Sequence, residues 1–268
     1  MKLGIVANKD LSMAINVART VYEYLKESGQ DIVVEKSLSK IFKVEGMEIE
    51  EMDADIIITV GGDGTVLHTL MKTSKPIFSI NAGRLGFLTE ILPVDIEYNI
   101  NKLIKKEYFI EERKKLKVLL NGERLPDCTN ELVIHTNEIS KMRTYAIYIE
   151  NELMDEARAD GIIISTATGS TSYSLSVGGP IVDPRISSMV ISFIAPFKLA
   201  ARPHVVPGNS NIEIHMLDKR KKNLIVLDGQ IRKIISPSDV IQVTESERTA
   251  RFVKFSKNFY EKLREKMI

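Results

Sequence analysis

The sequence predicts an α/β N-terminal domain with a doubly wound, mostly parallel sheet, followed by an all-β, sandwich-like C-terminal domain. In residues 1–97, short aliphatic and β-branched runs alternate with segments of helical apolar spacing, a pattern typical of βαβ units. Beyond them, many short strand-like runs follow one another with turn signals and hardly any helix between them. We therefore expect an α/β domain at 1–97, a β-sandwich domain at 98–250, and a terminal segment at 251–268 that packs back on the first domain.

The elements of the first domain follow from local patterns. Residues 12–28 carry apolar side chains at helical spacing, and Gly29 marks the end of this helix. Short apolar, β-branched runs indicate buried parallel strands. The expected order is strand 3–7, helix 12–28, strand 31–35, strand 56–60, helix 66–72 and strand 77–80.

The second half of the chain is predicted to consist of short strands. Dipeptides such as Asn121-Gly122 and Asp228-Gly229 indicate turns between them. A final helix at 258–267 has an apolar face that can pack on the first domain. After a short helix at 100–106, strands are expected at residues 116–120, 131–135, 144–149, 161–165, 189–194, 211–216, 224–227, 240–243 and 250–255.

Composition excludes several classes of protein. Of the 268 residues, 44% are hydrophobic and 27% are charged, as in ordinary globular proteins. The net charge of +1 gives no bias toward nucleic acid or membranes, and we interpret the basic run at 219–222 as a solvated hairpin turn. The single cysteine, Cys128, excludes an internal disulfide, and no apolar run is long enough to span a bilayer. The first residues do not resemble a signal peptide, so we expect a cytoplasmic protein.

A glycine-rich segment, Gly61-Gly62-Asp63-Gly64-Thr65, lies between an expected strand and an expected helix. Its three glycines are expected to adopt conformations closed to other residues and to let a ligand approach closely. The helix N-terminus offers free N–H groups and a partial positive charge, which favour phosphate. A carboxylate repels phosphate unless it holds a metal ion or takes a proton from an attacking hydroxyl, so Asp63 indicates phosphoryl transfer. The alternative is an ordinary turn in which Asp63 caps the helix.

A second segment, residues 160–180, joins an expected strand to a loop rich in small hydroxyl residues. Such a loop offers many hydrogen-bond donors, and its glycine lets a planar ligand lie close to the backbone. Tyr173 can stack on a nucleotide base. We favour a binding loop over a polar turn because the six hydroxyl residues from Ser165 to Ser172 exceed what a turn requires.

The pair Asn130-Glu131 opens another expected strand. An Asn side chain can pair with an adenine edge through one donor and one acceptor, and a Glu can accept from a ribose hydroxyl. In isolation these two residues would indicate no more than a loop.

With these segments in this order, the chain resembles the NAD kinase family. The resemblance extends from the first strand to about residue 256, and the block at 160–180 is its most specific part, because lipid kinases and phosphofructokinases share the Gly-Gly-Asp-Gly loop. The family often has Pro where Ala167 stands and Ala where Ser172 stands, and residues 196–203 match only loosely. The matching motifs are Gly61–Thr65, Leu85–Leu88, Asn130-Glu131, Asp160–Pro180, Arg202-Pro203 and Asp228-Gly229-Gln230.

The resemblance implies transfer of a phosphoryl group from ATP or polyphosphate to the 2′-hydroxyl of the adenosine ribose of NAD, giving NADP, at a site between the two domains. It implies that Asp63 orients or deprotonates this hydroxyl and helps to place the phosphates. The phosphate-binding residues would be Gly61, Gly62, Gly64 and Thr65.

The resemblance also implies the residues that bind the dinucleotide. Asn130 and Tyr173 would contact the adenine, and Glu131 would contact the ribose. Asp160 would reach the nicotinamide side, which in this family often belongs to a neighbouring subunit. The other residues expected to bind NAD are Gly64, Arg158, Thr171, Ser172, Ser176, Ala195 and Gln230.

The expected cofactor is Mg²⁺ or another divalent metal that arrives with the phosphates, because the sequence shows no aspartate ladder for a protein-built metal site. The expected partners are NAD, NADP and ATP or polyphosphate, and a homodimer or homotetramer is expected because strand edges can pair. Two other functions fit the same loop: a lipid kinase of the diacylglycerol or sphingosine type, and a non-catalytic sensor of NAD(H). A Rossmann dehydrogenase is disfavoured, since no G-x-G-x-x-G follows the first strand.

Overall fold

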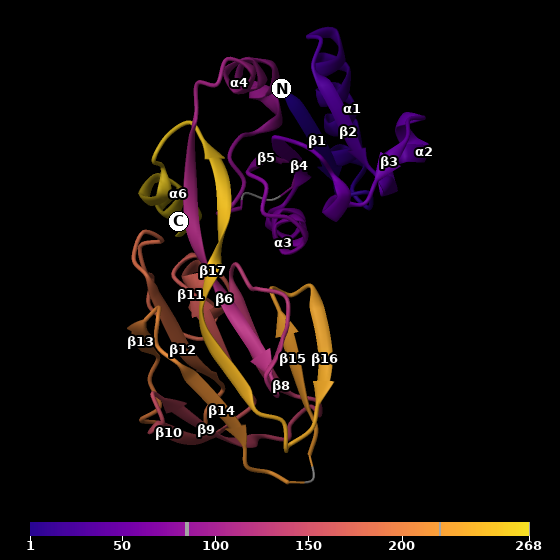
Figure 1. The fold of residues 1–268 in the computed structure, drawn as a ribbon. Coiled ribbons are helices and arrows are strands. Elements are labelled where there is room, and N and C mark those ends of the chain that lie inside the picture. Colours follow the sequence, from indigo (N-terminus) through magenta and orange to yellow (C-terminus); the bar gives the residue numbers. More distant parts are fainter. Residues whose placement is uncertain (84–85, 220, 268) are drawn as a thin grey trace. The chain divides into compact units, whose positions relative to one another are not determined.

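The computed structural model describes residues 1–83, 86–219 and 221–267, and the chain divides into two compact units (Figure 1). Unit 1 consists of Met1–Glu112 with Ala250–Ile268, and unit 2 consists of Arg113–Thr249. Residues 98–112, which we expected in the second domain, therefore belong to unit 1. The reason is that helix α4 (Ile96–Ile104), which begins and ends earlier than expected, buries apolar side chains in the core of unit 1.

A parallel sheet forms the centre of unit 1. Its strands lie in the order β5-β4-β1-β2-β3, and each neighbouring pair is parallel. The end of strand β17 pairs in parallel with β5 through Phe252 and Ile77. The mostly parallel sheet predicted from the sequence is confirmed. The strands are β1 (Lys2–Ala7), β2 (Asp31–Glu35), β3 (Gly46–Met47), β4 (Ile56–Gly61) and β5 (Ile77–Asn81).

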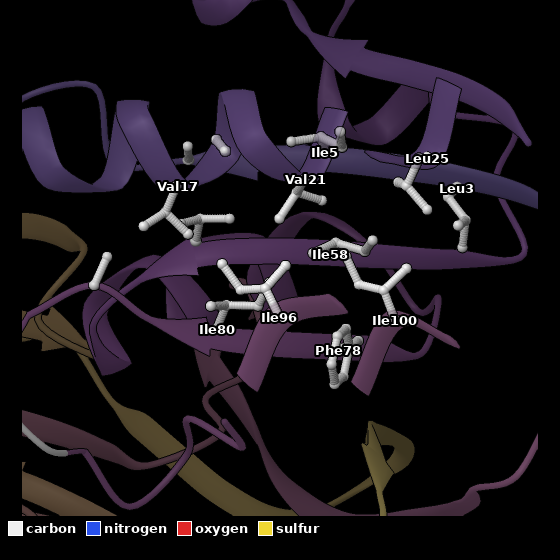
Figure 2. Packing of buried hydrophobic residues seen from close by; sticks show 14 of the residues in the cluster. Leu3, Ile5, Val17, Val21, Leu25, Ile58, Phe78, Ile80, Ile96 and Ile100 are labelled. Atoms are coloured by element: carbon white, nitrogen blue, oxygen red, sulfur yellow. The ribbon is translucent and has the colours of Figure 1, made fainter. Parts of the chain in front are cut away.

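Helices cover both faces of this sheet. Helices α1 (Ser12–Glu27) and α4 pack on the face that carries Ile58 (Figure 2), whereas α3 (Asp63–Lys72) packs on the face that carries Ile57. Successive side chains of a strand point to opposite faces, so an unbroken aliphatic run serves both layers. The remaining helices of unit 1 are α2 (Ser39–Phe42) and α6 (Phe259–Met267).

Two elements near the motifs differ from expectation. Helix α3 begins at Asp63 instead of residue 66, and one long strand, β17 (Ile241–Lys254), replaces the two strands expected at 240–243 and 250–255. The polar residues between those two runs continue the strand because their side chains have hydrogen-bond or ion-pair partners outside β17. Ser246 donates to Oδ2 of Asp127 at 2.6 Å, and Glu247 pairs with Arg124.

Unit 2 consists of two antiparallel sheets. One has the order β13-β12-β11-β8-β15-β16, and the other contains β10, β9, β14 and β17, with β6 beside β17. Tyr145 of β9 donates to Oδ1 of Asn223 on β15 at 3.0 Å, so the sheets are joined across a buried layer. The antiparallel β domain is confirmed. The strands are β6 (Phe109–Leu120), β7 (Glu123–Arg124), β8 (Glu131–Thr136), β9 (Arg143–Ile149), β10 (Glu152–Ala159), β11 (Gly161–Thr166), β12 (Ser188–Ile194), β13 (His204–Pro207), β14 (Ile212–Met216), β15 (Asn223–Leu227) and β16 (Ile231–Ile235).

The two-residue strand β7 was missed in the sequence. Three longer strands of unit 2, β10, β13 and β16, were missed as well. Each lies at the end of the strand order of its sheet and carries many exposed side chains, so its apolar alternation is weak. The turns predicted at Asn121-Gly122 and Asp228-Gly229 are confirmed, since all four residues have a positive φ. None of the described helices is long and apolar enough to cross a membrane.

Candidate functional site

The Gly-Gly-Asp-Gly segment lies where a strand of unit 1 ends and a helix begins. Strand β4 ends at Gly61, Gly62 precedes the helix, and α3 begins at Asp63. A Cβ added at Gly62 or Gly64 would have nothing within 4 Å, so the backbone here is open to a ligand. The N–H groups of the first turn and the helix dipole favour an anion at this point. The N–H of Thr65 is bonded to the Gly62 oxygen at 3.0 Å.

The conformations expected for these glycines are wrong. Gly61, Gly62 and Gly64 do not adopt a positive φ, because two of them continue a strand or a helix and the third connects the two. Gly61 is required by a close approach instead, since a Cβ there would lie 2.3 Å from Oγ1 of Thr65. The other half of our expectation, that the glycines let a ligand approach closely, stays a prediction.

The carboxylate of Asp63 is held by backbone groups from a distant part of unit 1. Its Oδ2 accepts the N–H of Phe87 at 2.8 Å, and its Oδ1 accepts the N–H groups of Leu88 at 3.1 Å and Thr89 at 3.3 Å. Within the described part of the chain, α3 has no side-chain cap. The structure therefore does not support the alternative in which Asp63 caps its own helix.

Gly86 allows this segment to approach Asp63. A Cβ at Gly86 would lie 1.8 Å from Oδ1 of Asp63, well inside van der Waals contact. Leu85, the first residue of the Leu-Gly-Phe-Leu element, lies outside the described residues. A carboxylate offers about four acceptor positions, so the three N–H groups leave about one position of the partly exposed Asp63 for a ligand.

An aspartate of unit 2, Asp228, is bound in the same way. Its Oδ2 accepts the N–H of Thr129 at 2.6 Å, and its Oδ1 accepts those of Asn130 at 2.8 Å and Glu131 at 3.0 Å. Asp228 and Gly229 both have a positive φ, as a type I′ turn between the hairpin strands β15 and β16 requires. This turn brings the carboxylate to the residues that open β8.

Asn130 and Glu131 are buried where β8 begins, with 7% and 6% of their surface exposed. Among the described residues, Oδ1 of Asn130 and Oε2 of Glu131 have no hydrogen-bond partner. A buried polar atom without a partner costs free energy in the folded protein. These two atoms are therefore suited to a polar ligand that enters beside them.

Burial and the nearby Asp228 raise the pKa of Glu131 to about 8, and burial raises the pKa of Asp228 to about 6. The three N–H donors oppose the shift at Asp228, whereas Glu131 receives the hydroxyl of Ser172 and a backbone hydrogen bond from Tyr173. At neutral pH we assign the negative charge to Asp228 and a proton to Glu131. Protonated Glu131 can donate to a ligand oxygen, in addition to the acceptor role expected from the sequence.

Residues 168–176 lie against this pair. They form a short 3₁₀ turn (Thr168–Thr171) and a single helical turn (Tyr173–Ser176). Ser172 donates its hydroxyl to Oε1 of Glu131 at 3.3 Å, and a Cβ at Gly169 would lie 2.1 Å from the Asn130 oxygen. Tyr173 is 39% exposed and Ser176 is also exposed, so a ligand can reach both. The structure thus brings together Asn130, Glu131, Thr171, Ser172, Tyr173 and Ser176.

Three other expected NAD-binding residues, Arg158, Asp160 and Ala195, form a separate group in unit 2. The guanidinium carbon of Arg158 lies 5.9 Å from the ring centre of Phe197, and the Phe197 N–H donates to the Arg158 oxygen at 2.8 Å. Ala195 follows β12 with a φ of 46°. The Asp160 N–H donates to the Ile194 oxygen at 2.9 Å.

Strand β11 separates the two groups. Gly161 at its start pairs with Ile194, whereas Ser165 near its end pairs with Glu131. At about 3.3 Å per residue, the two groups lie about 13 Å apart along the strand. Gln230, exposed in the turn after Gly229, belongs to neither group.

Comparison with known proteins decides the family. The family model described as the ATP-NAD kinase N-terminal domain matches residues 3–108, and that of the ATP-NAD kinase C-terminal domain matches residues 129–255. The chain belongs to the NAD kinase family. An NAD kinase of Thermoplasma acidophilum is 40% identical over 268 residues, covering 100% of this chain and 98% of that protein. An NAD kinase of Pyrococcus abyssi is 43% identical over 269 residues, covering 98% of this chain and 97% of that protein.

Solved structures agree with this NAD kinase fold. An NAD kinase from Archaeoglobus fulgidus in complex with ATP has a TM-score of 0.81 and 29% identity, covering 98% of this chain and 99% of that one. Yeast NADH kinase complexed with NADH has a TM-score of 0.92 over 100% of this chain and 87% of its own, and at 20% identity it shows the fold alone. The predicted kinase function and phosphotransferase class are confirmed. The comparisons do not support a lipid kinase or a non-catalytic sensor.

The sequence did not reveal the part that Asp228 plays in the structure. We interpreted Asp228-Gly229 as a turn and as a family match, which is correct, but the carboxylate also binds three N–H groups of residues 129–131. The two segments are nearly a hundred residues apart, so no local pattern joins them. The available signal was the residue type, since Asp in a tight turn often binds backbone N–H groups.

Proposed function

We propose that the chain transfers a phosphoryl group from ATP to the 2′-hydroxyl of the adenosine ribose of NAD, giving NADP. The observation that carries this proposal is the carboxylate of Asp63, which three N–H groups hold in one orientation in the first turn of a helix suited to phosphate. The relative from Archaeoglobus fulgidus, solved in complex with ATP, supports ATP as the donor.

Asp63 is assigned to the acceptor hydroxyl. A sugar hydroxyl is a poor nucleophile, and a nearby carboxylate can orient it or take its proton. The bonds from Phe87, Leu88 and Thr89 restrict rotation of this carboxylate, so its remaining acceptor position has a defined direction. Because phosphoryl transfer depends mainly on positioning and charge neutralisation, one well-oriented carboxylate is sufficient.

The phosphates are assigned to the start of α3. Gly62 and Gly64 leave space beside the backbone, and Thr65 supplies its hydroxyl. Gly61 is buried at the end of β4 and acts by letting Thr65 approach. Free N–H groups at a helix N-terminus are a general site for phosphate oxygens.

The adenosine is assigned to the residues around the start of β8. Oδ1 of Asn130 and the exposed ring of Tyr173 suit the adenine, by a hydrogen bond and by stacking. Oε2 of Glu131 suits a ribose oxygen or hydroxyl. Thr171, Ser172 and Ser176 extend the same polar lining.

The chemistry of the donor set fits a divalent metal held mainly by phosphate oxygens. Among the described residues, no group of three or more His, Cys, Asp or Glu side chains could hold a metal ion. Asp63 has about one acceptor position left, and Mg²⁺ usually keeps few protein ligands and several phosphate or water oxygens. When bound, Mg²⁺ would neutralise phosphate charge, and phosphate oxygens with the hydroxyl of Thr65 would hold it at the start of α3, which leaves the free acceptor position of Asp63 to the ribose hydroxyl.

We also propose a homodimer or homotetramer in the cytoplasm. Arg158, Asp160 and Ala195 lie about 13 Å along β11 from Glu131, which supports a role for this group toward the dinucleotide of a neighbouring subunit. Cys128 is a buried free thiol, which suits a reducing compartment.

The test is production of NADP by the purified chain. The protein is incubated with NAD, Mg²⁺ and either ATP or inorganic polyphosphate, and NADP is measured with an NADP-specific dehydrogenase. We expect NADP with ATP from the wild type, and a loss of about a hundredfold or more in kcat for Asp63→Asn. Asp53→Asn, an exposed aspartate of the same unit, is the matched control and should keep wild-type turnover. NADP formed with polyphosphate alone would overturn ATP as the donor, and near-normal turnover of Asp63→Asn would remove Asp63 from the mechanism.

A further inference from the structure

A buried cluster of charged residues lies directly behind the segment that holds Asp63. Glu90 follows that segment, and its Oε2 accepts from Nζ of Lys254 on β17 at 2.6 Å. Lys262 of helix α6 donates to the carbonyl oxygen of Thr89, and its Nζ lies 3.5 Å from Oε2 of Glu90. Lys254 is 2% exposed and Lys262 is 8% exposed. Burying two ammonium groups around one carboxylate costs free energy, so stability alone does not explain this arrangement.

The hydrogen bonds of Thr89 connect this cluster to Asp63. The N–H of Thr89 donates to Oδ1 of Asp63, and the carbonyl oxygen of the same residue accepts from Lys262. The Thr89 carbonyl shares its peptide group with the Glu90 N–H, which donates to the Ser79 oxygen at 3.0 Å, so Lys262 and Ser79 hold this peptide from two sides. The two peptide groups meet at the Cα of Thr89, so a shift at the Lys262 contact displaces the residue whose N–H helps to orient the carboxylate of Asp63.

Other contacts of α6 reach the same segment. Nζ of Lys266 lies 4.0 Å from the ring centre of Phe87, and its charge also acts on Asp63. A cavity of about 210 Å³ opens beside Lys262 and is lined by Thr89 and Glu90, with Glu261 and Glu265 from α6. The ammonium of Lys262 thus has space on one side and depends on the Thr89 carbonyl and Glu90 to fix its position.

We propose that Lys262 is a positioning residue for phosphoryl transfer: from helix α6 it binds the carbonyl oxygen of Thr89, and by fixing Thr89 it helps the N–H of that residue to orient the carboxylate of Asp63. This inference rests on the proposed role of Asp63 in the reaction. In this proposal, α6 and the buried Glu90 affect the rate of turnover but not the binding of NAD or of phosphate.

The titration of Lys262 supplies a readout specific to this role. Burial, with the charge of Lys254, lowers the pKa of Lys262 to about 8, while Glu90 opposes the shift. The charged groups facing Lys262 are Glu90 and Lys254 from outside its helix and Glu261 and Glu265 from its own. Above pH 8 the neutral amine donates a weaker hydrogen bond to Thr89, so kcat should fall on the alkaline side.

The test compares Lys262→Met, which keeps the stem without a donor, with Lys262→Arg, which keeps a charged donor. Arg264→Met, an exposed change on the same helix, is the matched control. For Lys262→Met we expect kcat to fall about ten- to a hundredfold with the KM for NAD within about twofold of wild type. Lys262→Arg should restore most of kcat and move the alkaline fall to higher pH, and Arg264→Met should behave as wild type.

A double-mutant cycle with Asp63→Asn decides whether Lys262 acts through Asp63. If it does, Lys262→Met should lower kcat little further when Asp63 is already Asn, whereas an independent effect would multiply. Melting temperature and NAD affinity by calorimetry identify a folding defect, which would lower both together with kcat. Wild-type kcat in Lys262→Met, a multiplicative cycle, or a kcat loss that follows unfolding would each overturn the proposal. An active Asp63→Asn would overturn the proposal for Lys262 and remove Asp63 from the mechanism, while NADP formed by the wild type would leave the proposed function standing.

Discussion

Asp63 in unit 1 and Asp228 in unit 2 each accept three consecutive backbone N–H groups from a segment far away in the sequence. Their surroundings differ. Asp228 is 4% exposed and lies in a hairpin turn, whereas Asp63 is partly exposed and lies in the first turn of a helix. The same arrangement therefore has two uses: the buried carboxylate organises its donors, Asn130 and Glu131, while the accessible one is itself held ready for a ligand.

The largest expected difference comes from replacing each aspartate by asparagine. Asp63→Asn should lower kcat about a hundredfold or more, because an amide cannot take a proton from the hydroxyl. Asp228→Asn should leave kcat at saturating NAD within a few-fold of wild type and raise the KM for NAD, because the donors it organises are residues that we propose to bind the dinucleotide. Steady-state kinetics with NAD and ATP measure both. Equal losses of kcat in the two variants would contradict the distinction between them.

Stability should also separate these two variants. An amide nitrogen at either position faces a backbone N–H, and a buried donor without an acceptor costs about 1–3 kcal/mol. The cost should be larger at Asp228, which is buried, than at Asp63, where water can replace the lost acceptor. Denaturant unfolding measures this difference, with Asp53→Asn as the exposed control.

Two glycine substitutions provide the next largest effect. A Cβ at Gly86 would meet the side chain of Asp63 at 1.8 Å, whereas one at Gly169 would meet the backbone oxygen of Asn130 at 2.1 Å. A side chain can rotate away, so Gly86→Ala should lower kcat about tenfold with little change in stability. A backbone cannot, so Gly169→Ala should destabilise the protein by about 2 kcal/mol or more and weaken NAD binding.

Kinetics, calorimetry and unfolding of both alanine variants check this contrast. Gly64→Ala, where an added Cβ meets open space, is a useful control for stability but not for phosphate binding. If Gly86→Ala lowered the free energy of unfolding as much as Gly169→Ala, the side chain of Asp63 could not rotate away, and the contrast between the two sites would be wrong.

The smallest effect is a pH dependence of stability that belongs to unit 2. With its pKa raised to about 8 by burial, Glu131 keeps its proton in the folded protein between pH 4.5 and 8, whereas the unfolded chain has lost it. The free energy of unfolding should therefore fall as pH rises, by about 2 kcal/mol between pH 6 and 8. Asp228 acts in the same direction at lower pH, since its pKa is raised to about 6.

Denaturant unfolding at pH 6 and 8 measures this change, and Glu131→Gln should remove most of it. Glu152→Gln, an exposed change in the same unit, should keep the wild-type slope. The window ends at pH 8 because Lys262, with its pKa lowered to about 8, makes folding more favourable as pH rises further. A slope in Glu131→Gln equal to that of the wild type would show that Glu131 is ionised in the folded protein.

Much of the fold could be predicted because its signals are local. The strand at residues 31–35 was expected with the bounds that the structure shows, and the turn at Asp228-Gly229 follows from its dipeptide. The start of α3 was placed too late because Gly64 is a poor helix former, although in a first turn few helical hydrogen bonds depend on it. Long strand β17 was divided in two because its polar middle is stabilised by partners elsewhere in the chain.

The candidate site was predictable only where its residues lie next to one another in a single sequence motif. The segments at 61–65, 130–131 and 160–180 were found in this way, and the structure joins Glu131 to Ser172. The contacts that orient these residues could not be found, because they link Asp63 to Thr89, Asp228 to Asn130, and Lys262 to Thr89 across the chain. Such pairs have no period or spacing, and only the folded chain reveals them.

Unit 1 contains both the first and the last residues of the chain, so during synthesis it is completed only after unit 2. Phe252, the β17 residue that pairs with β5, and the lysines that contact Thr89 and Glu90 are all translated after unit 2. A nascent chain that has grown only to residue 249 already contains the residues that we assign to the phosphates and to the dinucleotide. It still lacks the contacts that support the peptide behind Asp63, so we expect phosphoryl transfer to begin only once the last strand and helix leave the ribosomal exit tunnel.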